Sequence, residues 1–397
     1  MSKKVSVGAA IMLMGMTAAV TITITVLIYT NVWNGNVISL TQRQSLFSNL
    51  ATIDANVRKN YVGKIDETVL MDNLKAGYMA GIGDKHSLYF DAATYKEVQL
   101  NDSGKGLGIG VSVVKADDGN IKVVDISKGS PADVKAVMIG DIITIIGNQK
   151  VTDIGYDKAV NLLHGDEGTK ADFTVLRAGQ QIVFSIVRSQ FELQTIASQM
   201  INNIGYIKIK EFDNNTDEQF SAALDSLKSQ GAQGIIFDVR NNPGGELETC
   251  ENMLNKLLPK GPIVKSVDKN GKVTVLKYSD GVDFKLPMAV LTNGNSASAA
   301  ELFTDALRDY NKAKSVGTKT YGKGTMQQTF PLNDGSAITL TIAYFNPPKS
   351  PNFDGKGIIP DIEVELSADK LNHFYELKQS DDDQLQAAIS YVNTLIS

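Results

Sequence analysis

The stretch that most constrains the fold of this chain runs from Leu291 to Gln328. Residues 288–291 form an apolar run typical of a strand, and residues 292–295 (Thr-Asn-Gly-Asn) predict a turn. From residue 296 to 310, apolar side chains recur at the spacing of a helix with one buried face. The sequence therefore predicts a strand–turn–helix unit, which must bury the strand and one face of the helix together.

Ser298 lies at the junction between the predicted turn and the predicted helix. At such a junction a hydroxyl can point outward while the free N–H groups at the start of the helix point toward a bound substrate. The alternative is that the serines only cap the helix, with Ser296 as the N-cap and Glu301 in the first turns. The pattern Ser-Ala-Ser alone leaves both interpretations open.

A nucleophilic serine needs a base, and histidine is the usual one. The three histidines of the chain lie in stretches that do not look like catalytic sites: His86, His164 and His373. A lysine can replace histidine where burial lowers its pKa. Lys323 fits this role, because the glycines on either side of it let the backbone pass close to another segment. If the chain after Lys323 is extended, Gln327 shares its face and could orient the lysine amine.

The same lysine also ends a near-match to a nucleotide-binding loop. Residues 317–323 (Gly-Thr-Lys-Thr-Tyr-Gly-Lys) are one residue short of a P-loop, and Gly324 follows where the loop needs Ser or Thr to hold magnesium. No long helix is predicted after it. A P-loop nucleotide binder is therefore kept only as a minor alternative.

Two motifs around the serine and the lysine resemble those of a known family. They are Asn293-x-x-Ser296-Ala297-Ser298-Ala299-x-Glu301 and Tyr321-Gly322-Lys323-Gly324-Thr325-x-Gln327. Together they resemble the core of the carboxyl-terminal processing peptidases, also called tail-specific proteases. The resemblance implies that Ser298 is the nucleophile, that Lys323 is the general base and that Gln327 is the third member of the site.

A glycine-rich loop follows another predicted strand, residues 234–240. This loop, Asn241-Asn242-Pro243-Gly244-Gly245, is similar to a second motif of the same family. Acyl transfer needs donors aimed at the oxyanion of the tetrahedral intermediate. We assign this role to the N–H groups of Gly244 or Gly245 and of Ala299. The alternative is a tight turn that needs glycine only for backbone reasons.

Residues 104–188 change to short β-type runs separated by glycine turns. The loop Gly106-Leu107-Gly108-Ile109 resembles the carboxylate-binding loop of a PDZ domain, in which backbone N–H groups converge on a peptide C-terminus. Residues 156–163 are expected to form the helix that lines the peptide groove. His164 stands where relatives often carry an arginine, so peptide binding is either coupled to activity in a pH-sensitive way or unaffected by this residue.

The N-terminal segment, residues 5–30, contains no charged residue and follows Lys3 and Lys4. It is long enough to cross a membrane, and the lysines before it predict a cytoplasmic N-terminus with the rest of the chain outside. We therefore expect an uncleaved single-pass anchor in the cell membrane. A cleaved signal peptide is the alternative.

The sequence predicts a mixed α/β architecture. Its expected parts are the anchor at 5–30, a helical region at 38–97, an inserted PDZ β-barrel-like domain at 104–188, a catalytic domain of crotonase-like ββα sheet–helix units at 195–366, and a helical tail at 367–397. The tail is expected to pack on the N-terminal helices or on a second subunit, which suggests a homodimer. In the helical region, Asp84-Lys85-His86-Ser87 resembles a family segment, and its departure at Lys85-His86 is expected to be harmless.

The predicted function is that of a serine endopeptidase acting on protein substrates, recognised through a C-terminal or exposed peptide. No metal or cofactor is implied. The net charge of −5, without a basic block, argues against nucleic acid as a partner. The single cysteine, Cys250, is expected to be a small core residue. The main alternative is a catalytically silent PDZ scaffold at the membrane surface.

Overall fold

The computed structural model describes residues 40–282 and 284–396, and the chain divides into two compact units, residues 1–72 and 73–397. In the described part of the first unit, residues 40–60 are helical, and Arg58 pairs with Asp54 at 2.8 Å and with Glu67 at 2.6 Å. No helix within the described residues is both long and apolar enough to span a membrane. The predicted anchor, residues 5–30, lies outside the described residues.

The predicted helical region is interrupted by a strand. Helix α2 (Glu67–Ala80) and helix α3 (Ala92–Asp102) flank strand β1 (Leu88–Phe90), which pairs antiparallel with β18 (Ala337–Asn346). Its three residues are apolar or aromatic and fit a strand better than a helix. Because Ser87 accepts a hydrogen bond from the Thr341 N–H at 3.1 Å, the segment before β1 is also fixed to that sheet.

Residues 105–192 form the expected small β-domain. Strand β2 (Lys105–Gly108) pairs with β9 (Ser189–Glu192). The main sheet has the order β3-β4-β5-β7-β8, with β6 (Gln149–Lys150) paired to β5. Its strands are β3 (Val111–Lys115), β4 (Ile121–Ile126), β5 (Ile142–Ile146), β7 (Lys170–Arg177) and β8 (Gln180–Val187). Helices α4 (Pro131–Val134), α5 (Val151–Ile154) and α6 (Tyr156–Leu163) complete it, and α6 has the predicted bounds.

The central sheet of the second unit has the order β10-β11-β12-β15-β16-β19. Strand β10 (Ile196–Ile201) is antiparallel to β11 (Ile204–Ile209), and the remaining neighbours are parallel. Those strands are β12 (Gly234–Asp238), β15 (Met288–Thr292), β16 (Ala313–Gly317) and β19 (Ile362–Glu363). The side chains of β12 and β15 are buried on both faces, which is typical of a parallel sheet covered by helices.

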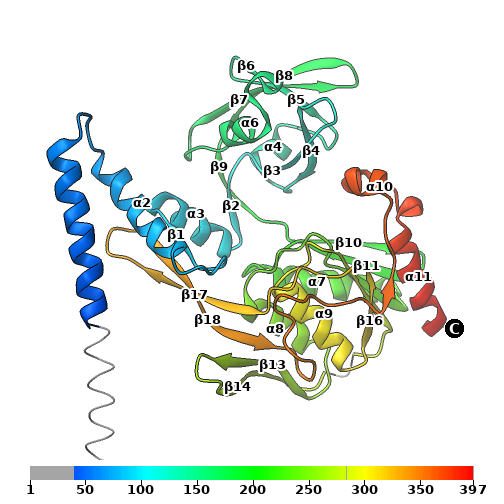
Figure 1. Ribbon diagram of the computed structural model, residues 1–397. Helices are drawn as coiled ribbons and strands as arrows, with labels where there is room; N and C mark the ends of the chain where they lie inside the picture. Colours follow the sequence, from blue (N-terminus) through cyan, green and yellow to red (C-terminus); the bar gives the residue numbers. More distant parts are fainter. Residues whose placement is uncertain (1–39, 283, 397) are drawn as a thin grey trace, which may run out of the picture. The chain divides into compact units, whose positions relative to one another are not determined.

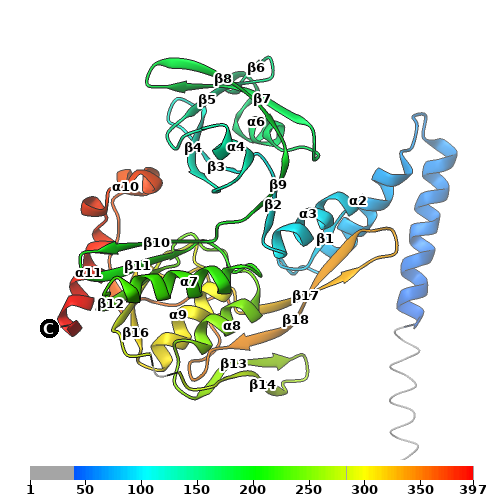
Figure 2. The same ribbon diagram turned by 180° about the vertical axis from the view of Figure 1, so that it is seen from behind.

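Helices cover both faces of this sheet (Figures 1 and 2). One face carries α7 (Thr216–Ser229), α8 (Leu247–Asn255) and α9 (Ala299–Asp309), which share one core with the sheet. Cys250 lies in that core and is fully buried, as predicted. The other face carries α11 (Asp383–Ile396), where Leu385, Ala388 and Val392 pack on the strands.

The predicted packing of the C-terminal tail was therefore wrong, although the tail is helical as expected. Its apolar side chains cover the chain's own central sheet, because the second face of a parallel sheet must also be shielded from water. One argument for a homodimer is lost with it. Short helices precede α11: α10 (Ala368–Asn372), η1 (Phe374–Glu376) and η2 (Gln379–Asp381).

A second sheet, with the order β1-β18-β13-β14, lies beside the central one, and β17 (Thr325–Pro331) also pairs with β18. Strands β13 (Gly261–Asp268) and β14 (Val273–Ser279) form a hairpin. Strand β17 begins two residues after Lys323, so this sheet fixes where the lysine loop ends.

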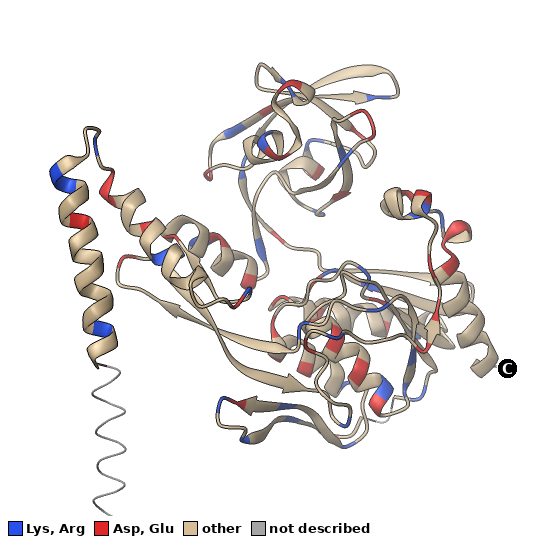
Figure 3. Cartoon of the chain, viewed as in Figure 1, with Lys and Arg blue, Asp and Glu red and all other residues tan. Residues whose placement is uncertain are grey.

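Basic and acidic residues are interspersed over the described chain, with no basic block (Figure 3).

Candidate active site

Ser298 is the residue that precedes helix α9, in a strained backbone conformation. Its φ of 56° and ψ of −116° lie outside the regions that side chains other than glycine prefer. The turn is held by Ser296, whose hydroxyl donates to the Val239 carbonyl at 2.7 Å and accepts from the Asn293 N–H at 3.0 Å. Ser296 therefore fixes the turn and is not the N-cap of the helix. The strained position at the helix start belongs to Ser298.

Lys323 lies on the loop between β16 and β17 and is half-buried. Burial lowers its pKa, and the negative charges of Asp84 and Glu301 oppose this shift only in part. No hydrogen bond joins Ser298 Oγ to Lys323 Nζ among the described contacts. The chain after the lysine continues as strand β17, without the helix that a P-loop requires, so the nucleotide-binding alternative does not fit.

No hydrogen bond joins the side chains of Gln327 and Lys323 in the described part of the chain. Its Nε2 donates to Thr325 Oγ1 at 2.9 Å and to Thr341 Oγ1 at 3.1 Å. The ladder between β17 and β18 also shifts register between Met326 and Gln327. The amide group is thus held from its nitrogen end, and Oε1 is the atom left to accept from Lys323.

Glu301 ties the serine to the lysine loop, a role that the sequence interpretation missed. The fully buried carboxylate accepts from the N–H groups of Ser298 at 2.9 Å, Gly322 at 2.7 Å and Lys323 at 2.8 Å. It also accepts from the Thr320 hydroxyl at 2.5 Å. Burial raises the pKa of Glu301, and these hydrogen bonds offset that shift in part. The sequence signal was Ser-x-x-Glu, which fits ordinary helix capping equally well.

The glycine loop lies directly against the serine turn. A Cβ on Gly244 would be 2.7 Å from Ser298 Cβ, and a Cβ on Gly245 would be 2.5 Å from the Phe212 carbonyl oxygen. Both glycines also have positive φ, so no other residue fits either position without strain. Glycine is therefore needed at both positions for backbone reasons, and the loop also lies in close contact with the turn that carries Ser298.

The three predicted oxyanion donors differ in how their N–H groups are used. The Gly244 N–H donates to Asn242 Oδ1 at 2.8 Å. Among the described residues, the N–H groups of Gly245 and Ala299 have no acceptor at hydrogen-bonding distance. These two groups remain able to bind an oxyanion, whereas Gly244 is committed to shaping its own loop.

A cavity of about 500 Å³ brings these segments together. It is lined by His86, Asn241, Pro243, Asn295, Ala297, Tyr321, Lys323 and Tyr375. His86, whose sequence context did not suggest a catalytic site, shares this cavity with Lys323. Burial lowers the pKa of His86, as do the charges of Lys323 and Lys85. Its Nε2 is buried and has no hydrogen-bond partner within the described part of the chain.

The predicted peptide-binding loop lies in the small β-domain. Gly106, Leu107 and Gly108 pair with β9, and the Ile109 carbonyl accepts from the Ala132 N–H at 2.8 Å. Leu107 and His164 line one cavity of about 750 Å³, although they are far apart in the sequence. The structure thus brings the glycine loop and the histidine after α6 to the same place.

Arg188, which the sequence interpretation did not single out, holds the end of helix α6. It is buried and donates to the carbonyls of Leu162 at 2.9 Å and Leu163 at 3.0 Å. Cations at a helix C-terminus are stabilising.

No cluster of three or more His, Cys, Asp or Glu side chains suited to a metal ion occurs in the described ranges.

Comparisons with known proteins find matches both for the region that contains Ser298 and Lys323 and for the small β-domain. Residues 203–364 match the model of peptidase family S41, and residues 97–176 match the PDZ domain model. The carboxy-terminal processing protease CtpA of Bacillus subtilis is 34% identical over 325 residues, which are 81% of this chain and 70% of that protein. A protein of Staphylococcus epidermidis named "Probable CtpA-like serine protease" is 32% identical over 78% of this chain and 63% of its own length.

The fold is also seen in a solved structure. The structure of a photosystem II D1 C-terminal processing protease superposes with a TM-score of 0.50 at 21% identity, over 79% of this chain and 86% of that one. This likeness concerns the mixed α/β fold. The family assignment rests on the sequence matches, which cover the central-sheet region and the small β-domain described above. The chain belongs to the carboxy-terminal processing proteases, serine-type peptidases of family S41 with a PDZ domain.

Proposed function

We propose that this chain is an endopeptidase in which Ser298 is the nucleophile and Lys323 is the general base. The observation that carries the proposal is the Glu301 carboxylate, which binds the N–H groups of both Ser298 and Lys323. One buried side chain thereby holds the serine turn and the lysine loop together. The lowered pKa of Lys323 adds to this, because a base must be unprotonated to act.

The reaction follows from these roles. Neutral Lys323 takes the proton from Ser298 Oγ while this oxygen attacks the peptide carbonyl carbon. The N–H groups of Gly245 and Ala299 bind the resulting oxyanion, and each such donor contributes about 3 kcal/mol in known cases. When the intermediate collapses, the leaving amine takes the proton from Lys323 and the acyl group stays on Ser298. Water then attacks the ester carbonyl while Lys323 accepts its proton. As the carbonyl carbon–Oγ bond breaks and the acid product leaves, Lys323 returns this proton to Ser298 Oγ.

In this mechanism Gln327 orients the lysine. Its Nε2 is held by two threonine hydroxyls, so its Oε1 is available to accept from Lys323 Nζ. The amine would then keep its lone pair for the serine proton. Substitution by glutamate would place a negative charge beside the lysine and raise its pKa.

The PDZ domain would admit the substrate through a C-terminal or exposed peptide held at Gly106-Leu107-Gly108-Ile109.

Residues 5–30 would anchor the enzyme in the cell membrane with its catalytic part outside the cytoplasm. Carbonate-resistant membrane pelleting of the full chain, lost on deletion of residues 5–30, would support the anchor. Release of the whole protein into the soluble fraction would refute it.

The test of the catalytic roles uses an unfolded protein substrate and three chains: wild type, Ser298→Ala and Lys323→Ala. We expect cleavage by the wild type only. Asp309→Asn serves as the control, because Asp309 accepts from the N–H groups of Lys349 and Ser350 at the far end of α9 and should not affect catalysis. Full activity of Ser298→Ala would refute the assigned nucleophile. Substrate binding without cleavage by any chain would favour a silent scaffold.

A further inference from the structure

We propose that Asp382, in the segment that leads into the C-terminal helix, is a positioning residue for the reaction. It holds the Arg240 guanidinium and, through it, the glycine loop at residues 241–245. The inference rests on the proposed function, because that loop carries one of the assigned oxyanion donors. Asp382 lies outside residues 203–364, the stretch that matches the S41 model.

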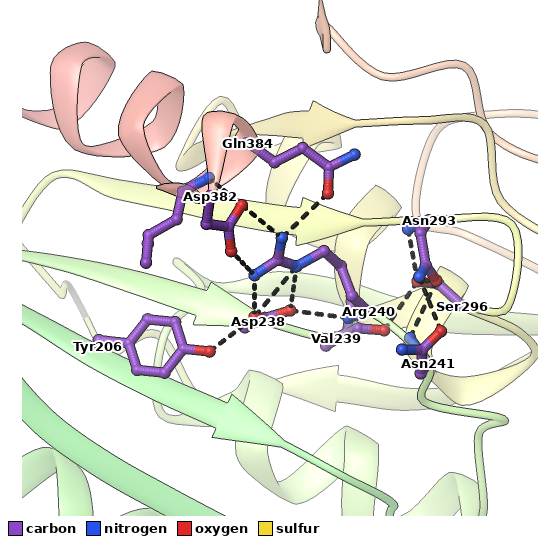
Figure 4. A network of polar contacts seen from close by, with 10 residues as sticks. Tyr206, Asp238, Val239, Arg240, Asn241, Asn293, Ser296, Asp382 and Gln384 are labelled. Atoms are coloured by element: carbon purple, nitrogen blue, oxygen red, sulfur yellow. Dashed lines mark hydrogen bonds and ion pairs between the residues drawn. The ribbon is translucent and has the colours of Figure 1, made fainter. Parts of the chain in front are cut away.

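The Arg240 guanidinium donates to the side chains of Asp238, Asp382 and Gln384 (Figure 4). Asp238 accepts from Nε at 3.0 Å and from Nη2 at 2.7 Å. Asp382 accepts from Nη1 at 2.9 Å and from Nη2 at 2.8 Å, and Gln384 Oε1 accepts from Nη1 at 3.0 Å. The guanidinium has five N–H donors, and this set of acceptors satisfies all of them.

Two of these acceptors come from the C-terminal segment, 142 and 144 residues away in the sequence. The side chains of Arg240, Asp238 and Asp382 are 3%, 1% and 8% exposed, so water contributes little. Burial acts to lower the pKa of Arg240, but Asp238 and Asp382 outweigh it and raise the pKa. A bidentate pair of this kind fixes the plane of the guanidinium as well as its charge.

The same segment also covers the arginine. The Phe374 ring lies 5.0 Å from Arg240 Cζ, within the range of a cation–π contact. The next residue, Tyr375, lines the cavity that contains Lys323. The C-terminal segment therefore contributes both to the support of the loop and to the wall of the candidate active site.

Arg240 leads directly into the glycine loop, and that loop is bonded to the serine turn. The Asn241 N–H donates to Asn293 Oδ1 at 2.9 Å, and the Asn242 carbonyl accepts from the Ala297 N–H at 2.9 Å. Asn241 has a φ of 61°, so the chain turns sharply at this point. A shift of Arg240 is thus passed to both the oxyanion loop and the residue before Ser298.

Asp382 is also part of the start of helix α11. Its Oδ1 accepts from the Leu385 N–H at 3.0 Å, and Gln384 Nε2 donates to the Val364 carbonyl at 2.8 Å. The packing of α11 on the central sheet therefore sets where the carboxylate lies. One side chain serves the docked helix and the loop beside the nucleophile.

The test compares Asp382→Asn with Asp383→Asn in the full chain. The asparagine keeps an oxygen for the helix start but cannot accept both guanidinium bonds. The control removes a neighbouring carboxylate with a 52% exposed side chain, which pairs with Lys370 at 2.7 Å. A misplacement of about 1 Å costs about 100-fold in rate, so we expect kcat to fall roughly 100-fold in Asp382→Asn with KM little changed. The control should stay within about twofold of the wild type.

Amide hydrogen exchange of the glycine loop gives a second readout that does not depend on cleavage. We expect faster exchange at residues 239–246 in Asp382→Asn, and unchanged exchange in helix α7 and in the control variant. If Asp382→Asn does not fold, Gln384→Met removes one acceptor from Nη1 together with the donor to the Val364 carbonyl, leaves both Asp382 bonds in place, and should show the same two effects at smaller size.

Wild-type kcat together with wild-type exchange in the loop would overturn the inference and leave the proposed function intact. If the wild type itself cleaved nothing, the proposed function would fail. Loop exchange would then still decide whether Asp382 holds the loop.

Discussion

Glu301→Gln is the substitution that best tests how the site is held together. Each carboxylate oxygen of Glu301 has two donors: Oε1 accepts from Thr320 and Gly322, and Oε2 accepts from Ser298 and Lys323. A glutamine offers only one oxygen. If its NH₂ group replaces Oε1, the Thr320 hydroxyl, which already accepts from the Ile358 N–H at 2.7 Å, can turn to accept from it, but its O–H then loses its acceptor, and the Gly322 N–H loses its acceptor as well.

The expected loss of stability follows from the donors that lose their acceptor. A buried donor without an acceptor costs about 1–3 kcal/mol, and the charge-assisted bonds that remain become weaker. We expect the free energy of unfolding to fall by about 2–4 kcal/mol. We also expect kcat to fall at least 10-fold, because the turn at Ser298 and the loop at Lys323 lose their common support.

The assay is urea unfolding followed by circular dichroism, together with cleavage of an unfolded protein. Glu248→Gln is the matched control, since Glu248 is an exposed glutamate in the first turn of α8. Its effect should stay within about 0.5 kcal/mol. An effect of Glu301→Gln no larger than that of the control, on both stability and kcat, would refute the role given to this carboxylate.

Three further predictions concern charge and backbone. Asp84→Asn removes a charge that raises the pKa of Lys323, so the rise of kcat/KM with pH should move to lower pH; a move to higher pH would contradict this. Burial and then Glu211 raise the pKa of Asp213 to about 7, so its contribution to stability is full below about pH 4 and is lost toward pH 7. Asp213→Asn should therefore raise stability at pH 8 by about 1–2 kcal/mol, measured by urea unfolding, and equal unfolding curves would count against this. Gly245→Ala should abolish cleavage, whereas Gly83→Ala, whose Cβ would meet nothing within 4 Å, should cost only about 1 kcal/mol; an active Gly245→Ala would exclude the close contact with Phe212.

The elements nearest the candidate site were the most predictable from the sequence. Strand β15, the turn and helix α9 follow from an apolar run and helical spacing. Away from this site, in the small β-domain, α6 was also predicted to the residue. What escaped prediction depends on contacts between distant segments. Ser-x-x-Glu gives no sign that the Glu301 carboxylate also binds Gly322 and Lys323. The pairing of β1 with β18 brings His86 to the lysine, and no local pattern encodes it. The covering of the central sheet by α11 depends on which face the other helices leave open.

The backbone at Ser298 has a consequence for the balance between folding and activity. A φ of 56° with a ψ of −116° costs a serine about 1–3 kcal/mol, and glycine adopts such angles far more easily. The chain thus keeps a side chain where its absence would make the fold more stable, so selection for stability alone would remove the hydroxyl. An inactive Ser298→Gly chain should unfold at higher temperature than the active one, and a laboratory search for heat-resistant variants that does not score cleavage would favour the loss of this serine.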